Sequence, residues 1–314
     1  MRKPHPDDRR RIHRPWVVPP GLLLLNEPFE GFNVLDETRS ELGVLLWQSL
    51  RDVDLWSLAR PEARTGLFSP GSLRRRSERI ESEIESDHPA RPLLEAMTRL
   101  LAAPDRVSEM EVSEVCEEIS RWASDTGLPR TALAFAQRAA LAAPDEAAPA
   151  YLVGLVSRRA ADYRRAETWL RRTLALSRLN RDWRYYGLAH LGLANLHMQR
   201  GDAPRARVRL LRALRASRRY GLWSVRSMVL HDLFCITATS EHATTSNVLR
   251  AQRVYQYSIA AAMTVEAAKN SSTWRRPSIM LLNKARCCAL NRFSAGMFSS
   301  LISKPSGSGS PCHE

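Results

Sequence analysis

Lysine is nearly absent from this sequence, in which 4 lysines stand against 43 arginines among 314 residues. No lysine lies between Lys3 and Lys269, so the formal net charge of +14 rests almost entirely on guanidinium groups. An arginine excess favours anionic partners, but it is also typical of proteins encoded in GC-rich genomes. The charge therefore does not identify a partner by itself.

Several signals of localisation and chemistry are missing as well. No apolar run approaches the roughly 18 residues that a membrane-spanning helix needs, and no apolar segment with a cleavage site follows the basic N-terminus. The five cysteines form no C-x-x-C pair. These absences favour a cytoplasmic protein with no membrane contact. The G-x-S-x-G, H-E-x-x-H, P-loop and G-x-G-x-x-G motifs do not occur in a suitable context, so we expect neither an enzyme nor a cofactor.

Three segments, beginning at Cys116, Ala150 and His190, align on small residues. In each segment, an apolar and a small residue are followed seven residues later by a turn. Alanine comes five residues after the turn. In chain order, the small residues are Ser120, Gly154 and Ala194, the turn residues are Gly127, Ala161 and Gly201, and the alanines are Ala132, Ala166 and Ala206.

This spacing predicts pairs of helices that cross closely. Small residues let two backbones approach, so we expect Gly154 to face Ala166, with leucines filling the seam at three- and four-residue intervals. The same reasoning pairs Ala194 with Ala206. Glycine or aspartate ends the first helix of a pair, and Pro129 falls in the first turn of a second helix. The predicted fold class is all-α, a helix-turn-helix solenoid.

The aligned segments resemble the tetratricopeptide repeat family, whose motif runs W-x2-L-G-x2-Y, then A-x3-F-x2-A, then P. The second half is matched by ALAFAQRAALAAP, AETWLRRTL and ARVRLLRAL, whereas the Trp and Tyr of the first half are replaced. The resemblance covers about Val112 to Arg219. The interval from Ala132 to Ala166 is 34 residues, as in the family, but the next interval is 40. We expect the six extra residues between helices, around residues 177–183.

The chain divides into four regions. Residues 1–35 contain six prolines and are predicted to be a basic extended arm. Residues 36–111 are predicted to be an N-terminal helical cap or degenerate repeats, with a capping box at Thr38–Glu41. Residues 112–236 are the predicted solenoid. Its final helix, at 221–236, would be the first helix of a fourth pair, and the second helix of that pair would lie near residues 246–260. The composition changes abruptly in residues 237–314, so this tail is either a divergent, partly disordered region or an out-of-frame translation.

The resemblance implies a groove lined by the first helix of each pair. The residues expected in this groove are Arg121, Tyr151, Leu155, Arg158, Arg159, Asn195, Gln199 and His231. Arginines there would anchor carboxylates through bidentate hydrogen bonds. We therefore predict a non-catalytic scaffold for protein–protein interaction, with an acidic peptide or protein as the partner.

A second interpretation comes from the block between Arg158 and Arg226. It contains 18 arginines, 4 acidic residues and interleaved aromatic residues, a combination that single-stranded nucleic-acid binders use for phosphates and base stacking. An arginine-rich nucleic-acid-binding regulator is therefore the alternative function. Arginines concentrated in the groove would favour an acidic peptide, whereas a continuous outer stripe would favour nucleic acid.

The sequence offers one weak candidate for a metal site. His231 and Cys235 lie four residues apart on one predicted helix, but two ligands are too few to hold a zinc ion. We expect both residues to pack, and we expect no metal.

Overall fold

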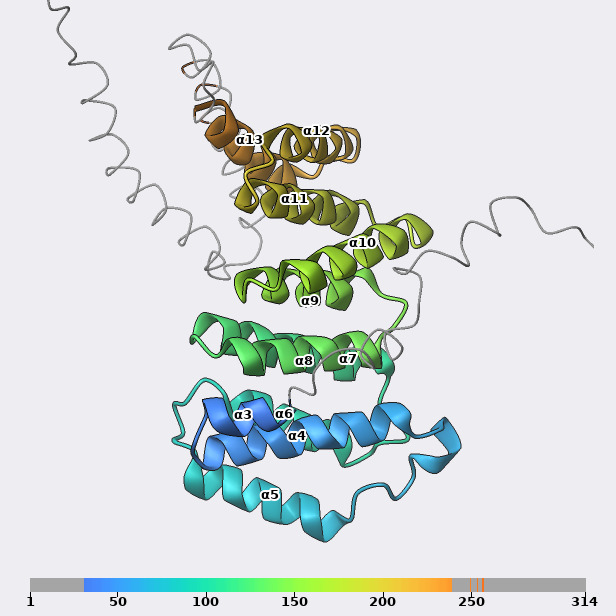
Figure 1. Cartoon of the computed structure of the whole chain (residues 1–314). Coiled ribbons are helices and arrows are strands. Elements are labelled where there is room, and N and C mark those ends of the chain that lie inside the picture. The colour runs from blue at the N-terminus through green and yellow to red at the C-terminus, as the bar shows by residue number, and fades with distance from the viewer. Residues whose placement is uncertain (1–30, 239–248, 250–252, 254–255, 257–314) are drawn as a thin grey trace, which may run out of the picture. The chain divides into compact units, whose positions relative to one another are not determined.

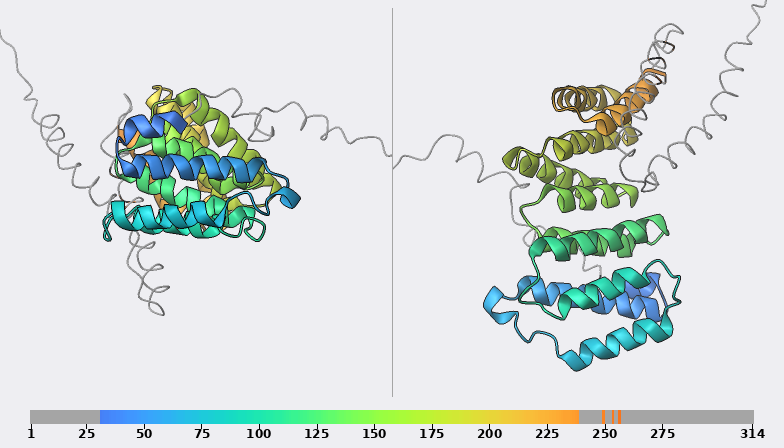
Figure 2. Two further views of the ribbon diagram at one scale, coloured as in Figure 1. Left: turned by 90° about the horizontal axis from the view of Figure 1, so that it is seen from below. Right: turned by 180° about the vertical axis from the view of Figure 1, so that it is seen from behind.

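The computed structural model describes residues 31–238 together with Leu249, Arg253 and Gln256. Every regular element in this part of the chain is a helix, so the predicted all-α class is confirmed. The helices pack against their chain neighbours in sequence order, as expected of a helical solenoid (Figure 1). A view from behind shows the same layers (Figure 2).

The helices form an N-terminal cap followed by three pairs and one further helix. The cap contains α3 (Gly31–Glu37), α4 (Glu41–Leu58), the 3-10 helix η2 (Pro61–Ala63), α5 (Pro70–Glu83) and α6 (Arg91–Leu101). The pairs are α7 (Glu109–Asp125) with α8 (Pro129–Ala142), α9 (Ala147–Arg159) with α10 (Tyr163–Leu179), and α11 (Trp183–Gln199) with α12 (Ala203–Arg219). Helix α13 (Trp223–Ala238) packs on α12.

The apolar stripe of α4 forms much of the core of the cap. The stripe residues Leu45, Leu46, Leu50, Val53 and Trp56 are at most 1% exposed. Trp56 also donates its indole N–H to the carbonyl of Pro104 at 2.8 Å, which satisfies the one polar atom of this buried ring. The core built around this stripe continues into α7 and α8.

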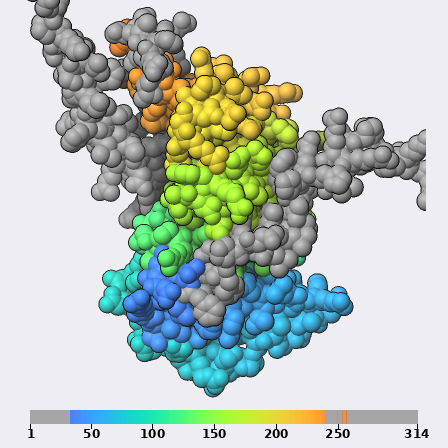
Figure 3. Space-filling model, viewed as in Figure 1, coloured from blue at the N-terminus to red at the C-terminus, as the bar shows by residue number. Residues whose placement is uncertain are grey.

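Two carboxylates join the cap to the first helix pair. Both oxygens of Asp54 on α4 accept from the guanidinium of Arg138 on α8, at 2.9 and 2.8 Å. Glu37 at the end of α3 accepts from the backbone N–H groups of Arg130 and Thr131, at 3.0 and 2.7 Å. These N–H groups lie in the first turn of α8, where helical partners are missing. In the space-filling view, α3 lies directly against the first pair (Figure 3).

Five of the helix connections use the same turn. A residue with positive φ ends the preceding helix, and the next residue donates its N–H to the carbonyl five positions back, at 2.8–2.9 Å, as in a Schellman motif. In three turns this second residue is an aspartate that caps the next helix. The positive-φ residues are Gly127, Ala161, Arg181, Gly201 and Gly221. The last four are spaced 20 residues apart, so α10, α11 and α12 all have 17 residues.

Arg181→Gly is expected to stabilise the protein by about 1 kcal/mol. Arg181 has φ of 56° and is exposed, and a side chain in the left-handed region costs roughly 1–2 kcal/mol, part of which the more flexible unfolded glycine chain offsets. Gly201→Ala, at the equivalent turn, should be destabilising. The midpoint of denaturant unfolding measures both changes. A lower midpoint for Arg181→Gly would show that its side chain contributes more than the strain costs.

One leucine explains why two positions in the stack are occupied by glycine. A Cβ atom added to Gly154 on α9 would lie 2.8 Å from Cγ of Leu170 on α10, and a Cβ added to Gly192 on α11 would lie 2.8 Å from Cδ2 of the same leucine. The nearest side chain to Gly154 is therefore Leu170, one turn beyond the expected Ala166. In the first pair, the small residue does face its alanine, because Ser120 donates to the carbonyl of Ala132 at 2.7 Å.

The extra residues of the longer repeat lie in helices, and the prediction of a longer connection was wrong. Helices α10 and α11 have 17 residues each, whereas α8 and α9 have 14 and 13. The segment 177–183 is the end of α10, a tight turn at Asn180–Asp182 and the start of α11. Capping aspartates at both turns let each helix grow by about one turn without lengthening the connection.

Two predicted boundaries also change. Helix α3 begins at Gly31, so the extended arm predicted for residues 1–35 does not include 31–35, and the remainder lies outside the described residues. The capping box expected at Thr38–Glu41 does not form, because α4 has Ser40 as its N-cap without a side-chain hydrogen bond. A capping box forms instead between Ser108 and Glu111 at the start of α7. The tail predicted for 237–314 lies outside the described residues, apart from Thr237, Ala238, Leu249, Arg253 and Gln256.

Candidate functional site

The two sides of the stack differ in how closely successive helices approach. Helix α7 contacts α9, α9 contacts α11, and α11 contacts α13, whereas α8, α10 and α12 do not contact one another comparably within the described part of the chain. Helices one pair apart converge on the inner side of a curved stack and spread on its outer side. We call the side formed by α7, α9, α11 and α13 the inner face, and the side formed by α8, α10 and α12 the outer face.

The first part of the inner face joins α7, α9 and α11. The rings of Tyr151 on α9 and Tyr185 on α11 lie 5.8 Å apart. Burial and, to a smaller extent, the nearby Glu117 carboxylate on α7 raise the pKa of Tyr185. Burial also raises the pKa of Tyr151 to about 12, so both phenols are neutral at physiological pH. Arg121 donates to Glu117 on the same helix, which leaves its side chain half-exposed.

Arg158 lies in the last turn of α9 on this face. Its side chain is half-buried, and burial lowers the pKa of its guanidinium, with Tyr151, Arg159 and the Asp232 carboxylate on α13 as electrostatic neighbours. The guanidinium of Arg158 forms no hydrogen bond or ion pair with any residue that the structure describes. A half-buried guanidinium without a direct carboxylate partner is the group on this face best prepared to receive an external anion.

The other predicted groove residues differ in their availability. Arg159 donates to the hydroxyl of Ser124 at 2.6 Å and lies 4.0 Å from Asp125, so it joins α9 to the end of α7. Leu155 and Asn195 are half-buried, and Gln199 is exposed. Neither amide side chain has a hydrogen bond to a described residue. Arg159 is therefore partly occupied, whereas the two amides are available.

His231 lies on α13 beside a carboxylate and a thiol. Its Nδ1 is 3.1 Å from Asp232 Oδ1, and the sulfur of Cys235 is 3.9 Å from the ring nitrogens. The hydrogen bond to Asp232 and then the contact with Cys235 raise the pKa of His231 to about 10, so the imidazole is positively charged at neutral pH. In the described ranges, no three potential metal ligands come together here or elsewhere.

The arginine block is divided between the two faces. Arg158 and Arg159 belong to α9, but Arg171, Arg200, Arg205, Arg209 and Arg212 line a pocket of about 480 Å³ on the outer face, between α10 and α12. The pocket exists because α10 and α12 are separated there, and the distance between these two helices cannot be read from the sequence.

The chain matches no family model, and neither a curated protein nor a solved structure matches it. None of the helices in residues 31–238 combines the length and the apolar character that crossing a bilayer requires.

Proposed function

We propose that this protein is a non-catalytic interaction scaffold of the tetratricopeptide kind, which binds an acidic peptide segment of a protein partner on its inner face. The observation that supports the proposal most directly is Arg158, a half-buried guanidinium without an ion pair among the described residues, beside the half-buried Tyr151. A carboxylate that reached Arg158 would form charge-assisted hydrogen bonds in a partly desolvated site, where such bonds are strongest.

The neighbours of Arg158 are suited to a peptide rather than to a small ion. Leu155 lies one turn before it on α9, which offers an apolar contact, and the exposed Gln199 offers polar groups for a main chain. Tyr151 and Tyr185 provide rigid aromatic surface beneath. Glu117 and Asp232 are each paired with a cation of their own helix, Arg121 and His231, so neither occupies Arg158, which leaves this guanidinium for the acidic group of the peptide.

A peptide-display selection on the full chain, after nuclease treatment, tests this function. Random peptides of about 15 residues are long enough to cover the face. We expect the enriched sequences to contain Asp or Glu next to apolar residues. Enrichment of peptides without acidic residues, or no enrichment in repeated selections, would contradict the proposal.

The double substitution Arg158→Ala with Arg159→Ala should lower the affinity for the selected peptides far more than Arg215→Ala with Arg218→Ala does. Each lost charge-assisted hydrogen bond costs about 1.5–3 kcal/mol, whereas Arg215 and Arg218 are exposed on α12 of the outer face. Both double variants remove the same charge. Titration calorimetry at two salt concentrations measures the loss. Equal losses that shrink together at high salt would indicate a diffuse basic surface.

Nucleic-acid binding is the second candidate function, because exposed arginines continue along α12. Arg207, Arg215 and Arg218 are exposed on this helix, and Trp183 stacks on Tyr220 at the end of it, with ring centroids 4.6 Å apart. Phosphate contacts by such a surface would make binding of an oligonucleotide fall steeply with salt concentration. Loss of oligonucleotide binding in the Arg215 and Arg218 double variant, but not in the Arg158 and Arg159 variant, would favour this second function.

A further inference from the structure

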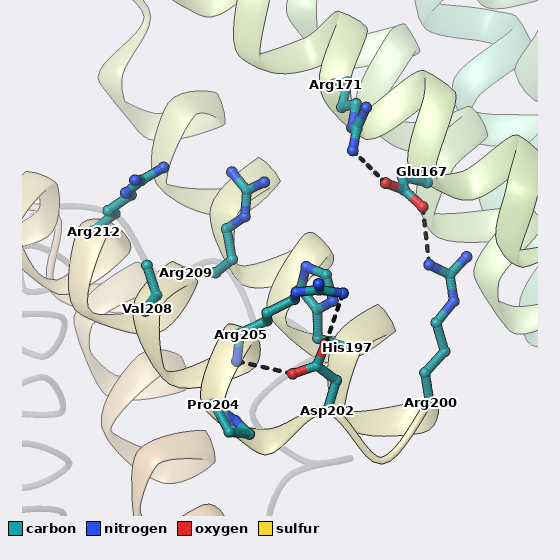
Figure 4. Close-up of a pocket in the computed structure, with 10 residues that line it drawn as sticks. All are labelled: Glu167, Arg171, His197, Arg200, Asp202, Pro204, Arg205, Val208, Arg209 and Arg212. Carbon is teal, nitrogen blue, oxygen red and sulfur yellow. Dashed lines mark hydrogen bonds and ion pairs between the residues drawn. The ribbon is translucent and has the colours of Figure 1, made fainter.

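A pocket opens on the outer face because α10 and α12 spread apart there. Residues of α10 and α12 form its two walls, and His197, Arg200 and Asp202, at the end of α11 and in the following turn, close it (Figure 4). Its volume is about 480 Å³. Among its ten lining residues are five arginines and only two carboxylates, so the pocket has a net charge of three with His197 neutral.

The two carboxylates are already shared by three of the arginines. Glu167 accepts from Arg171 at 2.6 Å and from Arg200 at 2.9 Å. Asp202 pairs with Arg205 at 3.1 Å and also caps the backbone of α12. These contacts hold three guanidinium groups in place around the opening. They also leave no carboxylate of the pocket for the arginines further along α12.

Arg209 and Arg212 are those remaining arginines. Both side chains extend from α12 into the space that faces Arg171 (Figure 4). Neither forms an ion pair or hydrogen bond with a described residue. Burial lowers the pKa of Arg209, and repulsion by Arg212 and then Arg171 lowers it further. The fold therefore brings like charges together here without neutralising them, which an anionic ligand would do.

His190 does not line the pocket, but it is close enough to Arg209 and Arg212 for their charges to lower its pKa. His190 on α11 is completely buried, and neither of its ring nitrogens has a hydrogen-bond partner. Burial lowers the pKa of His190 to about 3, and the charges of Arg209, Arg212 and Arg178 act in the same direction. The imidazole is therefore neutral and adds no charge to that of the arginines.

We propose that the pocket between α10 and α12 binds the phosphate group of a small phosphorylated compound. Two unpaired guanidinium groups match the charge of about −1.5 to −2 on a phosphate monoester, whereas a carboxylate would neutralise only one of them. Each planar guanidinium can hold two phosphate oxygens at once. The volume exceeds that of a phosphate ion and falls within the range of sites for small organic ligands, about 300–1,000 Å³. The exposed Val208 at the rim offers an apolar contact for the organic part.

The test is a calorimetric titration of the full chain, in a chloride buffer, with inorganic phosphate, pyrophosphate and malonate. Arg209→Gln with Arg212→Gln is compared with Arg215→Gln with Arg218→Gln, which removes the same charge from exposed positions of the same helix. We expect pyrophosphate and phosphate to bind more tightly than malonate. We expect the first double variant to bind phosphate and pyrophosphate about 10-fold or more less tightly than the unsubstituted chain. The second double variant should lose less than about 2-fold in affinity.

Three results with these small anions would overturn the proposal. They are undetectable binding of both phosphates to the unsubstituted chain, equal binding of malonate, and equal losses in the two double variants. Circular dichroism first establishes that each variant is folded. If the Arg209 variant is not, the exposed Arg212→Gln alone replaces it, with the same expected direction. A single-stranded oligonucleotide in a fourth arm identifies the other phosphate source: tight binding that both double variants reduce equally would assign this surface to nucleic acid and refute a small-molecule pocket.

Discussion

Gly154→Leu is expected to destabilise the protein by ~3 kcal/mol, because it places a branched side chain where even one added carbon meets Leu170 at 2.8 Å. Leu170 is 1% exposed and is confined by Gly154 on one side and Gly192 on the other. It cannot move away from one glycine without approaching the next helix. A thermal melt of the full chain should show a clear decrease in Tm.

Gly71→Leu is the matched control. Gly71 also lies in a helix, but an added Cβ would meet only the end of the flexible Arg75 side chain, at 3.9 Å. Removing a helical glycine in open space should be neutral or stabilising by up to ~1 kcal/mol. If both substitutions lower the Tm equally, the effect comes from the new leucine itself, and the close packing around Leu170 does not explain it.

A double-mutant cycle makes the assignment to Leu170 specific. Gly154→Ala alone should be destabilising, since the new methyl group collides with Leu170. In a Leu170→Ala background, which itself costs about 2–5 kcal/mol, the same substitution should become stabilising by up to ~1 kcal/mol, because alanine is the better helix former. The sign of the effect should therefore reverse. An unchanged loss in both backgrounds would mean that another contact limits the space at Gly154.

The sequence predicted the helix pairs because their determinants are local. Gly127 and Gly201 are spaced from Ala132 and Ala206 by the geometry of a tight turn, and the turn residues have positive φ as their position requires. Arg181 shows the limit of this signal. Its turn has the same geometry, but it contains no glycine and lies between two of the aligned segments, so the sequence suggested a longer connection where the structure has a Schellman turn and two longer helices.

The candidate sites depend on distances between helices that are far apart in sequence. Arg158 was predicted for the inner face from its repeat position, but its lack of an ion pair becomes visible only once α13 and α11 are in place. The outer pocket was missed, because Arg209 and Arg212 are ordinary members of an arginine-rich helix until α10 stands opposite them. Likewise, no local pattern around Glu37 indicates that it caps α8, more than 90 residues later.

Acidification from pH 7 to pH 5 is expected to destabilise the protein by about 2 kcal/mol through His190 alone. The folded pKa of about 3 lies below the unfolded value of about 6.5, so between these values the unfolded chain binds the extra proton. Stability from this histidine is therefore complete above pH 6.5 and is lost progressively as the pH falls toward 3. His190→Leu should remove this dependence of the free energy of unfolding on pH, whatever it does to stability at pH 7.

His231 should produce the opposite dependence and serves as the internal control. Its folded pKa of about 10 lies above the unfolded value, so its contribution is complete below pH 6.5 and is lost as the pH rises toward 10. His231→Gln should therefore flatten the alkaline side of the profile and leave the acid side unchanged. The summed contribution of the two histidines is expected to be greatest near pH 6.5, the unfolded pKa, because the contribution of His190 rises up to this pH and that of His231 falls above it.

The measurement is the free energy of unfolding in urea at several pH values from 5 to 9, for the unsubstituted chain and for both variants. Subtracting each variant's profile from that of the unsubstituted chain cancels the remaining groups, among them His197, whose pKa burial also lowers. A His190→Leu difference profile that is flat from pH 7 to pH 5 would mean that the folded protein accommodates a charged imidazole beneath Arg209 and Arg212. That result would require an anion or a rearranged guanidinium next to His190, since a buried imidazolium among arginines is otherwise unstable.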